Sequence, residues 1–95
     1  MLHAMEKIKR LKIENDLGLH GRAAAKIVEL VNKHNSKLYF KKDGHDEVDG
    51  SSILSILTLA CAKGTEIQAR TIGDDSEELI ETLSLLFKNK FGEGK

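Results

Sequence analysis

The chain has 95 residues, 40% hydrophobic and 32% charged, which is typical of one globular domain with a single core. Its 15 basic residues balance 15 acidic residues, so the charge gives no reason to expect binding to nucleic acid or to a membrane surface. No apolar run approaches the roughly 18 residues of a membrane span, and one cysteine excludes an internal disulfide, so we expect a cytoplasmic domain over residues 1–95 with a flexible tail at residues 1–5.

The first half of the chain predicts a strand, a helix and a hairpin. Residues Lys9–Ile13 alternate apolar and basic side chains, as a half-buried strand does. From Gly21 to about Asn32, apolar residues recur at helical spacing, which predicts an amphipathic helix whose apolar face holds Ala24, Ile27, Val28 and Val31. Residues Lys37–Lys41 alternate again and lead into Asp43-Gly44, a dipeptide suited to a tight turn, so a partner strand is expected over His45–Val48.

The second half predicts a helix, a strand and a final helix. Ser52–Ala60 is apolar on almost every face and should form a short helix, with Gly64 in a C-terminal capping position. Glu66–Ile72 alternates regularly, as a strand does, and the last helix should begin where Asp75 and Glu78 have the spacing of a capping box. The order βαββαβα indicates an α+β two-layer open-faced sandwich, in which three helices cover one face of a four-stranded antiparallel sheet.

The segment Leu17-Gly18-Leu19-His20-Gly21-Arg22 places a histidine where the first predicted helix begins. The first N–H groups of a helix have no partner within it, and the helix dipole puts about half a positive charge there. This end therefore favours a bound phosphate and disfavours a protonated imidazole. A neutral imidazole keeps a lone pair that can attack phosphorus, so His20 is a candidate phosphoryl acceptor.

Gly21 and Arg22 fit the same interpretation. Because Gly21 has no Cβ, backbone N–H groups can approach phosphoryl oxygens closely, and the guanidinium of Arg22 is a planar donor matched to those oxygens. The residues alone leave a second interpretation open, since a histidine in such a loop is more often an exposed capping residue than a nucleophile. The pattern by itself yields a candidate and no more.

Three segments of the chain form a recognisable combination. They are Gly18-Leu19-His20-Gly21-Arg22, Val48-Asp49-Gly50-Ser51-Ser52-Ile53-Leu54 and Ala62-Lys63-Gly64-Thr65-Glu66-Ile67. Together they resemble the HPr family, the histidine-containing phosphocarriers of the bacterial phosphoenolpyruvate-dependent phosphotransferase system. The resemblance implies that phosphorylated enzyme I passes its phosphoryl group to His20, with Arg22 assisting, and that His20 passes it to a sugar-specific or regulatory IIA-type acceptor. Such a carrier acts stoichiometrically and turns over no small molecule of its own.

The resemblance also implies a regulatory position and a docking surface. Ser52 matches the serine that an HPr kinase/phosphorylase modifies in some members. Its other interpretation is a helix N-cap, which we favour because nothing in the sequence shows that such a kinase exists. Ile53, Leu54 and Leu57 match the apolar patch that members present to partners, and a helix that is apolar on every face cannot bury all of it in a two-layer domain.

The sequence departs from the family at two positions beside the histidine. Gly21 stands where the family usually has alanine, serine or threonine, and Ala23 stands where it usually has proline. Both changes loosen the helix start, so we expect an altered transfer rate or partner choice. This keeps open a second function, a regulatory HPr paralogue that acts as a phosphorylation-switched binding module rather than as a sugar-transport relay. A generic binding module is a third, although it would not need His20 together with Arg22.

The remaining histidines suggest no further chemistry. His3, His34 and His45 have no metal-ligand spacing with Cys61, which lies in an apolar run and is expected to be buried. We therefore expect no metal and no cofactor, and we expect a monomer.

Overall fold

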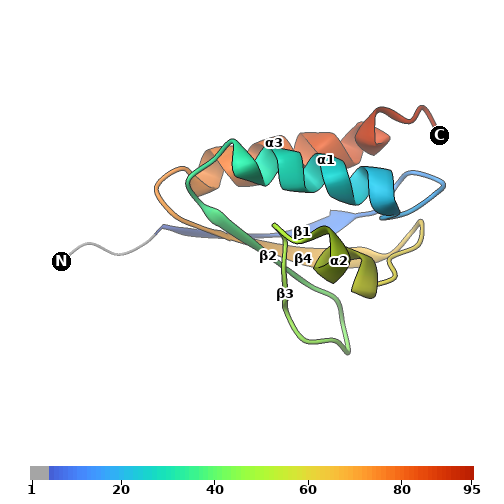
Figure 1. The fold of residues 1–95 in the computed structure, drawn as a ribbon, viewed down its shortest axis with the longest axis horizontal. Helices are drawn as coiled ribbons and strands as arrows, with labels where there is room; N and C mark the ends of the chain where they lie inside the picture. The colour runs from blue at the N-terminus through green and yellow to red at the C-terminus, as the bar shows by residue number, and fades with distance from the viewer. Residues whose placement is uncertain (1–4) are drawn as a thin grey trace.

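The computed structural model describes residues 5–95, and its four strands form one antiparallel sheet in the order β1-β4-β2-β3. Figure 1 shows α1 and α3 lying side by side over one face of this sheet, while α2 follows the short edge strand β3. The elements are β1 (Glu6–Lys12), α1 (Gly21–Asn32), β2 (Lys37–Lys41), β3 (Val48–Asp49), α2 (Ile53–Thr58), β4 (Glu66–Ile72), α3 (Ser76–Lys88) and the short 3-10 turn η1 (Lys90–Gly92). The predicted α+β open-faced sandwich is confirmed. The tail expected at residues 1–5 lies, apart from Met5, outside the described residues.

The central strand β4 has one buried face. Every second residue of β4 is buried beneath the helices: Ile67, Ala69 and Thr71. Three phenylalanines join the layers above it, because the Phe87 ring of α3 lies 6.2 Å from that of Phe40 and 5.0 Å from that of Phe91, measured between ring centroids. All three side chains are buried, so the sheet, α3 and η1 share one core.

The first strand begins earlier than its sequence pattern predicts. β1 starts at Glu6 rather than Lys9 and pairs with β4 along its whole length. Lys7 and Lys9 are half-buried on the same side of the strand as the buried Leu11, whereas Ile8 is exposed on the other side. In the first half of β1 the apolar side chain faces solvent and the lysines face inward, so the pattern of apolar and polar residues does not predict that this part is a strand.

The hairpin after β2 has a shorter second strand than predicted. The turn at Asp43-Gly44 forms, but the strand expected over His45–Val48 is confined to Val48–Asp49. Before it, the carboxylate of Glu47 accepts a hydrogen bond of 2.6 Å from Arg70 on β4. The segment ahead of β3 is therefore joined to the sheet through a side chain instead of through backbone pairing.

The predicted end of α2 is wrong. The helix ends at Thr58, and Ala60 adopts a left-handed backbone with φ +50°. Gly64 does not cap it, because this glycine lies in the next turn, where its N–H donates to the carbonyl of Ile13 at 2.7 Å. The chain leaves the helix early because Leu59 and Cys61 are both buried, which directs this segment into the core.

The capping box predicted for α3 is also wrong. Asp75 is the N-cap residue of α3, but its side chain makes no cap hydrogen bond to the helix. Its carboxylate instead accepts hydrogen bonds from the backbone N–H groups of Asn35 at 2.9 Å and Ser36 at 2.8 Å. These bonds join the start of α3 to the loop that precedes β2.

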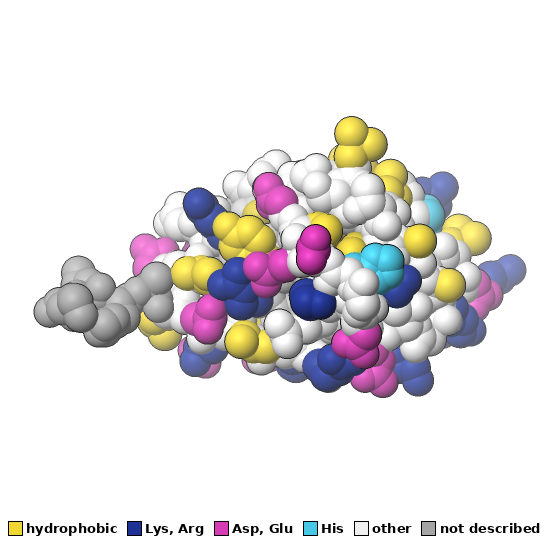
Figure 2. All heavy atoms as spheres, turned by 90° about the horizontal axis from the view of Figure 1, so that it is seen from below, with side chains coloured by type: hydrophobic (Ala, Val, Ile, Leu, Met, Phe, Trp, Pro, Cys, Tyr) yellow, Lys and Arg dark blue, Asp and Glu magenta, His cyan; other side chains and the backbone are white. Residues whose placement is uncertain are grey.

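Charges of both signs are interspersed on the side of the molecule away from α1 and α3, as Figure 2 shows. Arg70 illustrates the pairing, because its guanidinium contacts carboxylates of Glu47 and Glu6 and lies 4.8 Å from the centre of the Tyr39 ring. The pKa of Glu47 is lowered by the hydrogen bond from Arg70. None of the helices formed by residues 5–95 has the length and apolar character that crossing a membrane requires.

Candidate functional site

The loop before α1 positions His20. Within it, Gly18 has φ +67°, and a Cβ at this position would lie 2.4 Å from the carbonyl oxygen of Cys61. The same oxygen accepts a hydrogen bond of 2.9 Å from the N–H of the buried Leu19. The loop is therefore held against the segment after α2, and the next residue, His20, lies at the start of α1. Cys61 is buried, as predicted, and burial raises the pKa of its thiol.

The His20 ring has a different partner on each nitrogen. His20 is the N-cap residue of α1, and its Nδ1 accepts a hydrogen bond of 3.3 Å from the backbone N–H of Arg22. Its Nε2 contacts a carboxylate oxygen of Glu93. Because a carboxylate only accepts hydrogen bonds, these contacts are satisfied by a neutral ring that carries its proton on Nε2. The lone pair of Nδ1 then points toward the first turn of α1, and the side chain is 26% exposed.

The first turn of α1, next to the His20 ring, contains backbone N–H groups that the helix itself does not pair. Those of Gly21 and Ala23 have no acceptor within the helix, and the Ala24 N–H donates to the His20 carbonyl at 2.9 Å. A Cβ built on Gly21 would meet no atom within 4 Å. The glycine therefore leaves the approach to the ring open, but no crowding in the free protein requires it.

Arg22 and Ala23 occupy different environments in this turn. The Arg22 side chain is exposed, and within residues 5–95 its guanidinium makes no hydrogen bond or ion pair. It is free to turn toward a group that binds at His20. Ala23 is fully buried, so the position where the family usually has proline faces the core.

Sequence analysis missed two residues of this site, Asn15 and Glu93. Asn15 is fully buried, and its Nδ2 donates to the Gly18 carbonyl at 2.8 Å and to Oε1 of Glu93 at 2.9 Å. The hydrogen bond from His20 is the main cause that lowers the pKa of Glu93, and the bond from Asn15 and the charge of Arg22 act in the same direction. No local pattern connects these residues, because Glu93 lies 73 positions after His20.

The segment after α3 carries Glu93 back to His20. Lys90 and Phe91 both adopt left-handed backbone conformations, with φ +54° and +56°, which reverse the chain direction. The buried Phe91 ring anchors this reversal, and its carbonyl accepts a hydrogen bond from Lys26 of α1. The carbonyl of Lys95 accepts from the backbone N–H of Asp16 at 3.0 Å, so the segment lies against the loop that carries His20.

The short helix α2 presents apolar side chains to solvent. Ile53, Leu54 and Leu57 are 39%, 76% and 37% exposed, whereas Ile56 is buried. The expected exposure of this helix is therefore observed. Sequence analysis missed Leu17, which is 66% exposed in the loop before His20.

Ser52 forms the N-cap of α2. Its Oγ accepts a hydrogen bond of 3.2 Å from the N–H of Ser55. The capping interpretation of Ser52 is confirmed, and the residue is half-buried and directly precedes the exposed Ile53 and Leu54.

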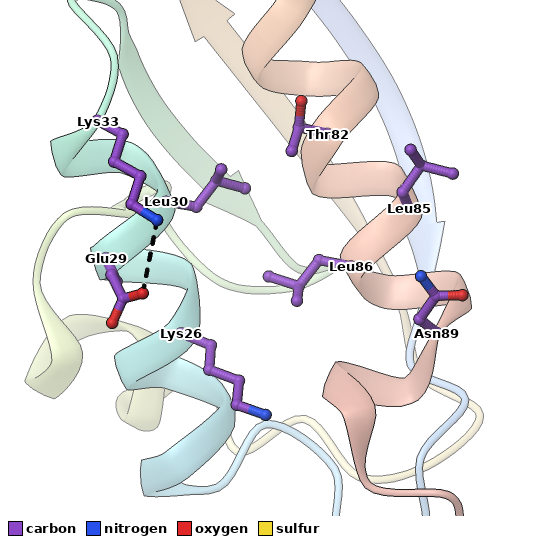
Figure 3. A pocket seen from close by; sticks show the side chains of 8 residues that line it. All are labelled: Lys26, Glu29, Leu30, Lys33, Thr82, Leu85, Leu86 and Asn89. Atoms are coloured by element: carbon purple, nitrogen blue, oxygen red, sulfur yellow. Dashed lines mark ion pairs between the residues drawn. The ribbon is translucent and has the colours of Figure 1, made fainter.

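A hollow of about 440 Å³ lies between α1 and α3, away from these residues (Figure 3). Leu30 and Leu86 reach into it from the two helices, and Lys33 pairs with Glu29 on one wall at 3.7 Å. None of the predicted site residues lines this hollow. The predicted site is a surface around one imidazole rather than an enclosed pocket.

Comparison with known proteins identifies the family of this chain. Residues 7–89 match the family model described as the PTS HPr component phosphorylation site. The phosphocarrier protein HPr of Xylella fastidiosa is 40% identical over 83 residues, 87% of this chain and 92% of that protein. Phosphocarrier protein NPr of Escherichia coli is 31% identical over 83 residues, with the same coverage of 87% and 92%. The crystal structure of HPr from Thermoanaerobacter tengcongensis superposes with a TM-score of 0.86 at 37% identity, covering 92% of this chain and 97% of that one. The chain belongs to the HPr family of phosphocarrier proteins.

Proposed function

We propose that this chain accepts a phosphoryl group on His20 from phosphorylated enzyme I and passes it to IIA-type acceptors of the phosphotransferase system. The observation that carries the proposal is the His20 ring, whose Nδ1 faces the first turn of α1 while Nε2 contacts Glu93. This geometry leaves one nucleophilic nitrogen beside backbone donors. Residues 1–95 act in this proposal as a single HPr-like domain.

The incoming step needs no proton transfer. The Nδ1 lone pair of His20 forms a bond to phosphorus while the bond between phosphorus and the donor breaks, and the proton stays on Nε2. The Arg22 N–H, which donates to Nδ1 in the free protein, becomes available to a phosphoryl oxygen, together with that of Gly21. The exposed guanidinium of Arg22 adds a second charge-assisted contact. Phosphoryl transfer is accelerated mainly by such positioning and charge stabilisation.

The exposed apolar residues of α2 serve as the docking surface. Ile53, Leu54 and Leu57 form a small patch, and α2 packs against the helix that carries His20. Small apolar patches with a polar rim suit transient complexes, which a carrier needs in order to leave one partner for the next. A phosphate on Ser52, added by an HPr kinase/phosphorylase, would place negative charge at the edge of this patch and weaken docking.

The test uses enzyme I, magnesium and labelled phosphoenolpyruvate. The protein should acquire label in a bond that is labile in acid and stable in base, as a phosphorus–nitrogen bond is. His20→Ala should remove the label, and His45→Ala, which changes an exposed histidine in the hairpin turn, should retain it. Label that persists in His20→Ala would contradict the assignment.

A second reaction separates the two functions left open by the sequence. The labelled protein is mixed with IIA domains, and loss of label from the carrier is followed. Transfer to a IIA domain supports the relay. Labelling without onward transfer to any IIA domain would refute the relay and leave a phosphorylation-switched binding module.

A further inference from the structure

A chain of polar contacts runs from the interior of the protein to His20. Buried Asn15 donates from one amide nitrogen to the Gly18 carbonyl and to Oε1 of Glu93, and the other carboxylate oxygen of Glu93 contacts Nε2 of His20. The Glu93 side chain is only 8% exposed. We propose that Glu93, held in place by Asn15, is a positioning residue that keeps Nε2 of His20 protonated while Nδ1 carries the phosphoryl group.

A protonated Nε2 matters in the outgoing step, in which His20 passes its phosphoryl group to an acceptor. When the bond between phosphorus and Nδ1 breaks, its electron pair returns to Nδ1. If Nε2 carries a proton, the leaving group is a neutral imidazole. If Nε2 has lost its proton, the leaving group is an imidazolate anion, which leaves far more slowly. A carboxylate at Nε2 stabilises the protonated ring, as carboxylates do for catalytic histidines elsewhere.

Asn15 gives this arrangement its rigidity. Its two hydrogen-bond acceptors fix the orientation of the amide, because the opposite orientation would turn its oxygen toward the Gly18 carbonyl and the Glu93 carboxylate. Glu93 thereby has one oxygen occupied and the other directed at His20. The low pKa of Glu93 is consistent with this role, since the carboxylate stays charged through the neutral range.

The other charged groups around the site do not make this contact. Asp16, Arg22 and Lys95 line a surface hollow with Glu93, and Asp16 pairs with Lys63 at 2.7 Å. Lys26 donates to the Phe91 carbonyl. All of them stay unchanged when Glu93 alone is substituted, so a difference between the wild-type protein and a Glu93 variant reports on the carboxylate.

The effect on transfer rests on the proposed function, so the test uses protein phosphorylated without enzyme I. Phosphoramidate, a small-molecule phosphoryl donor, is used to phosphorylate His20, and nitrogen-15 NMR of the labelled ring identifies the phosphorylated nitrogen and the charge state of the other. The pH at which half of the phosphorylated rings have lost the Nε2 proton is then measured between about pH 6 and 10. Failure of enzyme I to phosphorylate the protein would refute the proposed function and leave this measurement intact.

Glu93→Gln should move this midpoint toward acid by about one pH unit, which is the size of one partly exposed charge-assisted hydrogen bond. Glu93→Asp, which keeps the charge, should restore part of the shift. Glu29→Gln is the matched control, because Glu29 is an exposed glutamate of α1 that pairs with Lys33, and it should leave the midpoint unchanged. Asn15→Ala should shift the midpoint in the same direction as Glu93→Gln. If Asn15→Ala does not fold, the two Glu93 variants alone decide whether the carboxylate keeps Nε2 protonated.

In the transfer reaction, Glu93→Gln should slow loss of phosphoryl to a IIA domain about tenfold above the midpoint and much less below it, because at low pH the ring is protonated without help. Equal midpoints in wild type and Glu93→Gln, an equal shift in Glu29→Gln, or a phosphoryl group found on Nε2 would each overturn the proposal.

Discussion

Gly18→Ala should destabilise the protein by straining the loop that positions His20. The new side chain must tolerate φ +67°, which costs about 1–2 kcal/mol for a residue with a Cβ. Its Cβ would also lie 2.4 Å from the Cys61 carbonyl oxygen, closer than carbon and oxygen approach without displacement. That oxygen cannot withdraw freely, because it accepts the hydrogen bond from Leu19, so overpacking adds about 1–3 kcal/mol.

Together the two effects lower the free energy of unfolding by about 2–5 kcal/mol. Even a decrease of about 2 kcal/mol lowers the midpoint of thermal unfolding by about 8–16 °C in a domain of this size. The assay is thermal and urea unfolding followed by circular dichroism. Gly21→Ala is the matched control, since a Cβ there meets nothing within 4 Å and its backbone is not left-handed. This variant should gain up to about 1 kcal/mol from better helix propensity. If Gly18→Ala unfolds within about 0.5 kcal/mol of the wild type, the steric argument for this loop is refuted.

Four further predictions follow from the same structure. Leu54→Asp should slow phosphoryl transfer from enzyme I at least about tenfold with little change in stability. Leu85 is an exposed leucine of α3, and Leu85→Asp should slow the transfer little. Equal transfer rates in the two variants would argue against the α2 docking surface. Ser52→Ala should lower the free energy of unfolding by about 1 kcal/mol because the N-cap hydrogen bond is lost, and a variant as stable as the wild type would contradict the cap. Ser52→Asp should keep the cap but slow phosphoryl transfer from enzyme I. Hydrogen bonds from the loop before β2 lower the pKa of Asp75 below its ordinary 3.8, so the stabilisation by this carboxylate is present above pH 3.8 and is lost as pH falls through the lower folded pKa. Asp75→Asn should therefore make the free energy of unfolding depend less on pH on the acid side. An unchanged pH dependence would speak against this account. Ala23→Pro should change the rate of transfer from enzyme I by stiffening the helix start, and an unchanged rate would count against the loosened site.

Local periodicity explains which parts of the fold are predictable from the sequence. α1 and β4 have the predicted bounds because each has one face in the core, and burial imposes a period of 3.6 or 2 on their apolar residues. β1 was predicted too short because Lys7 and Lys9 lie on its inner side. Half-buried lysines bury their aliphatic stems while keeping the ammonium group in water, and a pattern of residue types does not reveal this.

At the site, too, the locally determined feature is predictable from the sequence and the feature that depends on tertiary contacts is not. His20 is found at the helix N-terminus where the sequence placed it, because the start of an amphipathic helix is a local property. Its contact with Glu93 depends on a chain reversal through Lys90 and Phe91, two residues with no intrinsic preference for left-handed backbone. Packing of the Phe91 ring in the core and the hydrogen bond from Lys26, which lies 65 positions earlier in the chain, select that conformation.

The return of the last residues to the loop before α1 bears on how the protein should be labelled or immobilised. Because the carbonyl of Lys95 is hydrogen-bonded to Asp16, an affinity tag or fluorescent fusion placed after Lys95 would emerge beside the loop that carries His20, the proposed phosphoryl acceptor. β1 begins at the opposite end of the molecule, as Figure 1 shows. A tag on the amino side of the chain is therefore the better choice for kinetic and binding measurements.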